Sequence, residues 1–181
     1  MDLLTTSEIY FFREPKHYDL LQTELPKLGN RAHISVWSAA ASLWDKAFST
    51  AMLMSDLQIM GRIGPDWSIL ATDISHRAPL SAKEAVYPSD RLRAVAPERL
   101  LRCCLRGESE AEGQVQMQDK LRARVQFGPL NLCKPFDGLG PFDIVFLRNV
   151  SIYIDPETTL NTDPLLALPL RGGLSQNFVD Y

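Results

Sequence analysis

The segment from His33 to Thr72 constrains the fold more than any other part of this sequence. His33 to Trp37 has the character of a short strand, and Asp45 to Met60 repeats apolar residues at helical spacing. After a turn at Gly61 to Pro65, the run from Trp67 to Thr72 is typical of a buried strand. Strand, helix and strand in this order form a βαβ unit, whose two strands lie parallel in one sheet. The sequence therefore predicts an α/β fold with a parallel sheet.

The segments on either side of this βαβ unit add further elements to the fold, and one insertion separates the later strands from it. We expect this insertion to be a small antiparallel β-subdomain near Val86–Gln126, because two short strands flank an acidic turn there. The other predicted elements are, in chain order, a short loop and then a helix within Thr5–Leu28, helices over Leu80–Ala85 and Pro97–Leu105, hairpin strands at Cys103–Arg106 and Gln114–Gln118, and strands over Val125–Asn131 and Phe142–Leu147.

Beyond Leu160 the periodicity fails, since Pro164, Pro169 and a Gly172-Gly173 pair break up the segment. We therefore expect a sheet that is incomplete at its C-terminal edge. The strand Phe142–Leu147 would then lose a neighbour, and its apolar side chains would lack cover.

Composition narrows the function classes. At 181 residues the chain fits a single domain over 1–181, and a net charge of −3 gives no argument for nucleic acid as a partner. Cys103 and Cys104 are adjacent and Cys133 stands alone, so neither a disulfide framework nor a zinc site is expected. Free thiols, with no signal-peptide pattern and no apolar run of membrane-spanning length, favour the cytoplasm.

Two features suggest a nucleotide-like ligand. The small residues of Ser38–Ser42, including Ala40, follow a strand and precede a helix, where a ligand could approach the helix N-terminus. Asp73 ends the next strand, where a carboxylate can accept both hydroxyls of a ribose. Tight strand–helix packing explains the small residues equally well, and Asp73 alone could be a turn or capping residue. The spacing does not distinguish S-adenosylmethionine from a nicotinamide dinucleotide.

Three further polar positions accompany them. Arg13 follows two phenylalanines, which suits a guanidinium held at an apolar edge for a carboxylate, or a surface ion pair with Glu14 or Glu8. Arg148-Asn149 closes an apolar strand at the end where such sheets bind ligands. Tyr153 follows shortly afterwards and could equally be an aromatic packed on the core.

Taken together, the motifs resemble the methyltransferase domain of the CheR family, the chemotaxis-receptor protein-glutamate O-methyltransferases that use S-adenosylmethionine. The matching stretches are Thr5-Thr6-Ser7-Glu8-Ile9-Tyr10-Phe11-Phe12-Arg13-Glu14, Ser38-Ala39-Ala40-Ala41-Ser42, Ala71-Thr72-Asp73-Ile74, Asn131-Leu132 and Phe146-Leu147-Arg148-Asn149-Val150-Ser151-Ile152-Tyr153. The resemblance implies a Rossmann-like methyltransferase sheet and glutamate side chains of chemoreceptors as the methyl acceptors. It also implies that the inserted hairpin is a receptor-docking subdomain.

The resemblance also assigns site residues. Cofactor-contacting positions are Ser7, Arg13, Ala40, Lys46, Asp73, Asn131, Leu132, Arg148 and Asn149, and Arg13 and Tyr153 lie next to methyl transfer. Methyl transfer to a carboxylate needs little acid–base help, because the sulfonium is activated and glutamate is ionised at neutral pH. The protein mainly holds donor and acceptor in line and excludes water.

The chain departs from the family pattern beside the cofactor. Trp44 stands where the family has glycine, Lys46 where it has a glutamate, and Ser7 and Ile9 where it has asparagine and threonine. A like charge roughly 5 Å from the cationic cofactor costs about 3 kcal/mol at an effective dielectric near 20, about a hundredfold in affinity.

The ends of the chain also depart from that pattern. From the resemblance we expect that the family's N-terminal helical domain is absent and that its C-terminal segment is shortened. The alternative hypothesis is therefore a non-catalytic, protein-binding or relic domain. A nicotinamide dehydrogenase is a more distant one, since no Gly-rich fingerprint is present.

Overall fold

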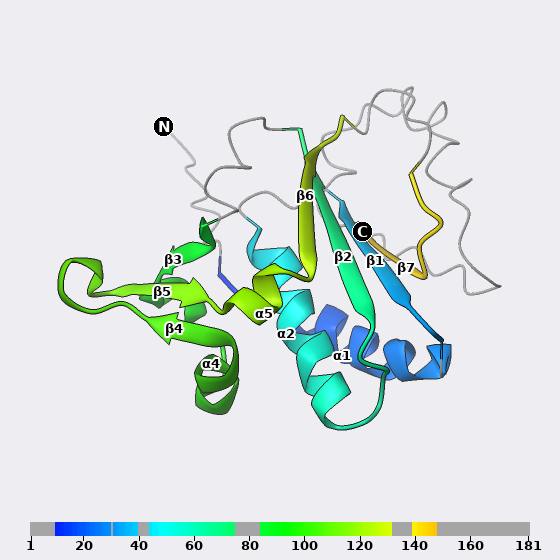
Figure 1. Cartoon of the computed structure of the whole chain (residues 1–181), viewed down its shortest axis with the longest axis horizontal. Coiled ribbons are helices and arrows are strands. Elements are labelled where there is room, and N and C mark those ends of the chain that lie inside the picture. The colour runs from blue at the N-terminus through cyan, green and yellow to red at the C-terminus, as the bar shows by residue number, and fades with distance from the viewer. Residues whose placement is uncertain (1–9, 30, 40–43, 75–83, 132–138, 148–181) are drawn as a thin grey trace, which may run out of the picture.

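A parallel four-stranded sheet forms the centre of the protein (Figure 1). The computed structural model describes residues 10–29, 31–39, 44–74, 84–131 and 139–147. The strands are β1 (Ile34–Ala39), β2 (Trp67–Asp73), β6 (Val125–Pro129) and β7 (Ile144–Leu147). They lie in the order β6-β2-β1-β7 and all three pairings are parallel. Along the chain this is the order third, second, first, fourth, as in doubly wound nucleotide-binding folds, so the predicted α/β class is confirmed.

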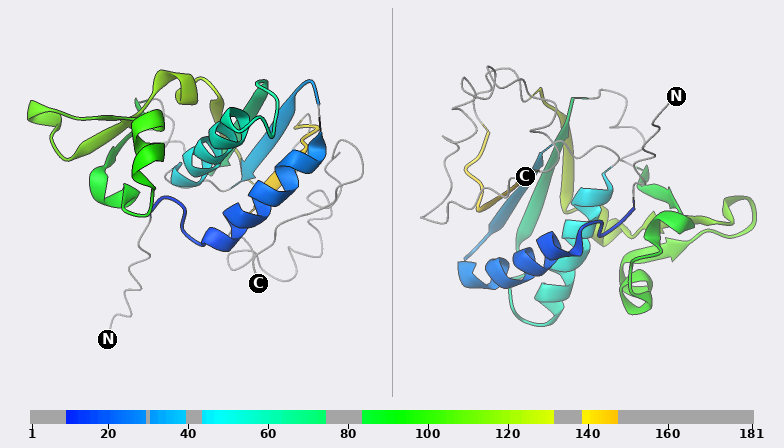
Figure 2. Two further views of the ribbon diagram at one scale, coloured as in Figure 1. Left: turned by 90° about the horizontal axis from the view of Figure 1, so that it is seen from below. Right: turned by 180° about the vertical axis from the view of Figure 1, so that it is seen from behind.

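Two helices cover one face of this sheet. In α2 (Asp45–Ile59), apolar side chains on most of the circumference are buried, as expected for a helix between two layers. The helix α1 (Pro15–Glu24) begins at a proline, which suits the first helical turn, and continues as the 3-10 turn η1 (Leu25–Leu28). It runs beside α2 (Figure 2). The predicted βαβ unit is therefore present, with β1 and β2 in register from Ile34↔Trp67 to Ser38↔Ala71.

A three-stranded antiparallel sheet projects to one side of the parallel sheet (Figure 1). Its strands β3 (Val86–Pro88), β4 (Cys104–Arg106) and β5 (Gln114–Met117) lie in the order β3-β5-β4. The predicted hairpin is confirmed, whereas β3 was not predicted. The accompanying helices are η2 (Ser89–Leu92), α4 (Pro97–Cys103), η3 (Ser109–Ala111) and α5 (Asp119–Arg122).

The helix of the antiparallel subdomain ends earlier than predicted. The helix expected over Pro97–Leu105 ends at Cys103, because Cys104 already pairs with Met117 of β5. The helix expected over Leu80–Ala85 lies mostly outside the described residues, as does the segment beyond Leu160.

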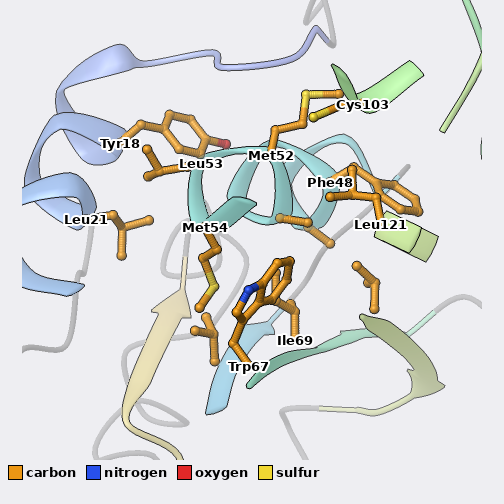
Figure 3. Packing of buried hydrophobic residues seen from close by; sticks show 14 of the residues in the cluster. Tyr18, Leu21, Phe48, Met52, Leu53, Met54, Trp67, Ile69, Cys103 and Leu121 are labelled. Carbon is orange, nitrogen blue, oxygen red and sulfur yellow. The ribbon is translucent and has the colours of Figure 1, made fainter. Parts of the chain in front are cut away.

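The hydrophobic core is centred on α2. Side chains from α1 and from the sheet converge on Phe48, Met52 and Met54 of this helix, which are fully buried (Figure 3). The core extends to Leu121 of α5 and to Cys103 of α4, so both sheets share one hydrophobic cluster.

The expected lack of cover on the last strand is wrong for its apolar side chains. Phe142, Ile144, Val145 and Phe146 are at most 9% exposed. Trp37 stacks on Phe142 at 5.6 Å between ring centroids, and Phe146 meets the ring of Tyr18 at 5.9 Å. Of the described strands, β7 forms one edge of the sheet, yet Ile144, Val145 and Phe146 in it are buried.

Within the described ranges, no helix is both long and apolar enough to cross a membrane. The same ranges hold no group of three or more histidine, cysteine or acidic side chains placed to bind a metal ion.

Candidate functional site

The order of the parallel strands indicates where a ligand would bind. The chain moves outward from β1 to β2 and β6 and then returns to the other side of β1 with β7. In such sheets ligands bind outside the carboxyl ends of the strands, where the order reverses. Here that position lies beyond β1 and β7. Ala40, Arg148 and Asn149 directly follow these strands and lie outside the described residues, as do Ser7, Leu132 and Tyr153.

The structure brings together two of the predicted residues, Asp73 and Asn131. Asp73 is the last residue of β2 and pairs in register with Pro129 of β6. The backbone N–H of Leu130 donates to the carbonyl oxygen of Asp73 at 2.8 Å, so Asn131 follows the linked strand ends directly. Both side chains are half-buried. A carboxylate and an amide at the same edge of the sheet suit a ligand with hydroxyl and amine groups.

Ser38 supplies a buried polar group near the strand reversal. It lies in β1 between Ala71 of β2 and Phe146 of β7 and is 1% exposed. Its hydroxyl makes no hydrogen bond in the described part of the chain. Buried hydroxyls without a partner are uncommon, and this one is compatible with a polar ligand at the carboxyl end of β1.

The N-terminus of α2 lies beside this edge. Trp44, the residue before the helix, has φ +67°, a left-handed backbone that bulky residues rarely adopt. A left-handed backbone of this kind favours glycine. The ring of Trp44 is nonetheless buried in the core. Asp45 is buried and Lys46 is half-buried, so both charges of the first turn are partly withdrawn from solvent.

Phe12, the residue before Arg13, is hydrogen-bonded to the N-terminal part of α2. The N–H of Phe12 donates to the Ser49 hydroxyl at 3.1 Å, and that hydroxyl donates to the carbonyl oxygen of Asp45 at 2.6 Å. Arg13 lies 4.0 Å from the carboxylate of Glu14, the ion pair left open by the sequence, and about a third of its side chain is exposed. Arg13 therefore makes the surface ion pair, while the residue before it is hydrogen-bonded to α2.

Sequence reasoning missed Ser49 and Tyr87 as parts of this region. Tyr87 of β3 packs edge to face on Phe11 at 5.0 Å and approaches Phe48 at 6.1 Å. Its hydroxyl is buried without a hydrogen-bond partner among the described residues. Burial, followed by the charge of Asp45, raises the pKa of Tyr87 above its ordinary value. No local pattern marks either residue, because their contacts join distant segments.

Comparison with known proteins places these features in a family. The model of the CheR methyltransferase, SAM binding domain, matches residues 7–162. The chemotaxis protein methyltransferase of Escherichia coli (strain K12) is 36% identical over 156 residues, which cover 86% of this chain and 53% of that protein. Chemotaxis protein methyltransferase 2 of Pseudomonas aeruginosa is 33% identical over 188 residues, covering 99% of this chain and 66% of that protein.

Among solved structures, the glycopeptide N-methyltransferase MtfA complexed with sinefungin is similar at a TM-score of 0.46 and 15% identity, covering 90% of this chain and 45% of that one. This chain spans about half the length of the first curated relatives, 53% and 54%. The family model covers most of the chain, and the chain belongs to the CheR methyltransferase SAM-binding domain family.

Proposed function

We propose that this chain binds S-adenosylmethionine at the carboxyl edge of its parallel sheet and takes part in methylating glutamate side chains of chemotaxis receptors. The observation that carries the proposal is the placement of Asp73 and Asn131 at neighbouring, hydrogen-bonded strand ends, within a chain that matches the family over residues 7–162. We treat residues 1–181 as one methyltransferase domain, with the antiparallel subdomain inserted at about 86–126.

The described residues fit such a cofactor. The Ser38 hydroxyl is buried at the strand reversal without a hydrogen-bond partner among the described residues, and the half-buried carboxylate of Asp73 can accept two neighbouring hydroxyls of a ribose. The amide of Asn131 can both donate and accept beside it. When bound, S-adenosylmethionine supplies a methyl group on an activated sulfonium. In our proposal Ser7, Ala40, Leu132, Arg148 and Asn149 complete the binding site.

Arg13 and Tyr153 have the roles closest to the reacting groups. A guanidinium forms paired, charge-assisted hydrogen bonds with a carboxylate, so Arg13 would orient a carboxylate of the cofactor or of the acceptor glutamate. Tyr153 would position the acceptor through its hydroxyl. Neither residue needs to move a proton, because the acceptor carboxylate is ionised at neutral pH.

Lys46 opposes this site electrostatically. A cationic side chain in the first turn of α2 disfavours a cationic ligand, and half-burial reduces the screening by solvent. We therefore propose that the chain binds the cofactor more weakly than a chain with glutamate at this position. The second candidate function, a non-catalytic binding domain, is supported by Lys46 together with the left-handed Trp44.

The test is calorimetric titration with S-adenosylhomocysteine, the demethylated product, followed by labelled-methyl transfer to a chemoreceptor peptide. Asp73→Asn should weaken binding by about tenfold or more, since a hydrogen bond to a charged group contributes about 1.5–3 kcal/mol. Asp66→Asn is the matched control. Asp66 precedes the opposite end of the same strand, is 60% exposed and pairs with His33 at 3.0 Å.

Three outcomes are informative. If Asp73→Asn and Asp66→Asn weakened binding of S-adenosylhomocysteine equally, the binding site at Asp73 would be rejected. Binding without methyl transfer would favour the non-catalytic domain. No binding even by Lys46→Glu would reject the proposed function.

A further inference from the structure

Arg99 of α4 is one of the side chains that connect the antiparallel subdomain to the segment carrying Arg13, and it is the one that contacts Phe12. Its guanidinium donates to the carboxylate of Asp56 on α2, with 2.7 Å between Nε and Oδ2. The same guanidinium lies over the ring of Phe12, with Cζ 4.4 Å from the ring centroid. Arg99 therefore contacts both α2 and the residue immediately before Arg13.

The contact with Asp56 is duplicated by a second arginine. Arg102, one helical turn later in α4, donates to the other carboxylate oxygen of Asp56 at 2.7 Å. The Asp56 side chain is only 8% exposed, so its charge needs a partner. Either arginine can supply one, but it is the guanidinium of Arg99 that lies over the ring of Phe12.

Phe12 needs external contacts to keep its conformation. Its φ is +56° and that of Glu14 is +60°, so left-handed residues flank Arg13 on both sides. Each such residue costs about 1–2 kcal/mol relative to the ordinary backbone. The restraints on Phe12 are the hydrogen bond to Ser49, the ring contact with Tyr18 at 4.8 Å and the guanidinium of Arg99. The side chain of Arg99 is 22% exposed, which strengthens its attraction to the ring compared with a solvated cation.

We infer that Arg99 is a positioning residue, which holds Phe12 in its left-handed conformation and thereby sets the direction of Arg13 towards the carboxylate that it binds. The part that concerns Arg13 rests on the proposed function, whereas the restraint on Phe12 does not. Through this contact α4 of the antiparallel subdomain controls the geometry of the cofactor edge.

The experiment compares Arg99→Gln with Arg102→Gln in the full chain. Both substitutions remove one of the two arginines from Asp56, so both should lower the melting temperature. Hydrogen exchange is measured on the peptide containing residues 10–17, and affinity for S-adenosylhomocysteine is measured by calorimetry. Arg99→Gln should speed exchange in that peptide by about tenfold, equivalent to about 1.4 kcal/mol, and weaken binding by a similar factor. Arg102→Gln should leave both unchanged.

Arg99→Lys keeps a cation over the ring and should recover part of both effects, which a purely structural role would not predict. If Arg99→Gln does not fold, the comparison of Arg99→Lys with Arg102→Lys replaces it, with the same ordering expected. Equal exchange in the Arg99 and Arg102 variants would overturn the inference. If neither the unmodified chain nor Lys46→Glu binds S-adenosylhomocysteine, the proposed function fails, and the exchange rates still decide the role of Arg99.

Discussion

The ring of Trp44 meets the ring of Phe127 edge to face, with 4.7 Å between the centroids and 68° between the planes. The two residues connect the N-terminus of α2 to β6, and Trp44 is 2% exposed. Its backbone has φ +67°, which favours glycine, while its side chain belongs to the core. One position thus carries both a strained backbone and a buried aromatic ring, and the two contribute to stability with opposite signs.

Trp44→Gly should destabilise the fold by about 2 kcal/mol. Removing a buried large aromatic ring costs about 3–5 kcal/mol, and relief of the left-handed backbone returns about 1–2 kcal/mol. Trp44→Ala removes the ring without relieving the backbone, so it should be less stable than Trp44→Gly. Urea unfolding measures both free energies. If the alanine variant were the more stable of the two, the left-handed assignment would be wrong.

Lys46→Glu should strengthen binding of S-adenosylmethionine by roughly one to two decades, because it replaces repulsion of a cation by attraction. Lys46→Gln should give an intermediate gain. Because residue 46 is half-buried, added salt should reduce the gain in affinity from Lys46→Glu only in part. Calorimetry at two salt concentrations measures this gain. The control is Lys120→Glu, on the exposed side of α5, which should leave the affinity for S-adenosylmethionine unchanged. Equal gains from both substitutions would show a general charge effect.

The parallel sheet was predictable because its signals are local. The apolar spacing in Asp45–Met60 and the strand before Asp73 lie within single elements, and each matches the structure within about two residues. The strand Val86–Pro88 escaped prediction because it is three residues long, ends in proline and depends on pairing with β5.

The candidate site was predictable only as a set of motifs. Asp73 follows a recognisable strand, but Ser49 binds the N–H of Phe12 across 37 residues of chain. Arg99 reaches Asp56 across 43 residues. No pattern in either segment encodes such contacts, since packing of α1, α2 and α4 creates them.

Asp143→Ala should destabilise the fold by about 3–5 kcal/mol. The side chain of Asp143 is fully buried and accepts hydrogen bonds from Arg31, from the Ser35 N–H at 2.7 Å and from the Ser35 hydroxyl at 3.0 Å. Its loss leaves the Ser35 N–H, at the pairing of β1 with β7, and the Arg31 guanidinium without their carboxylate. Thermal melting measures the loss of stability.

The control is Asp119→Ala, at an 87% exposed carboxylate paired with Arg122, which should cost less than about 1 kcal/mol. Similar losses in both variants would mean that Asp143 does not hold this edge of the sheet.

Arg13→Ala should cost about 2–4 kcal/mol of transition-state stabilisation in methyl transfer, because a guanidinium orients a carboxylate through two charge-assisted hydrogen bonds. Lysine at this position carries the charge without the planar pair of donors and should recover only part of the rate.

The alternative role, a surface ion pair with Glu14 at 4.0 Å, makes a different prediction. Under it, Glu14→Gln should match Arg13→Ala in both activity and melting temperature. Labelled-methyl transfer to a chemoreceptor peptide, normalised to folded protein, separates the two roles. An unchanged specific activity in Arg13→Ala would exclude Arg13 from the site, and the carboxylate would then need another partner at the N-terminal part of α2.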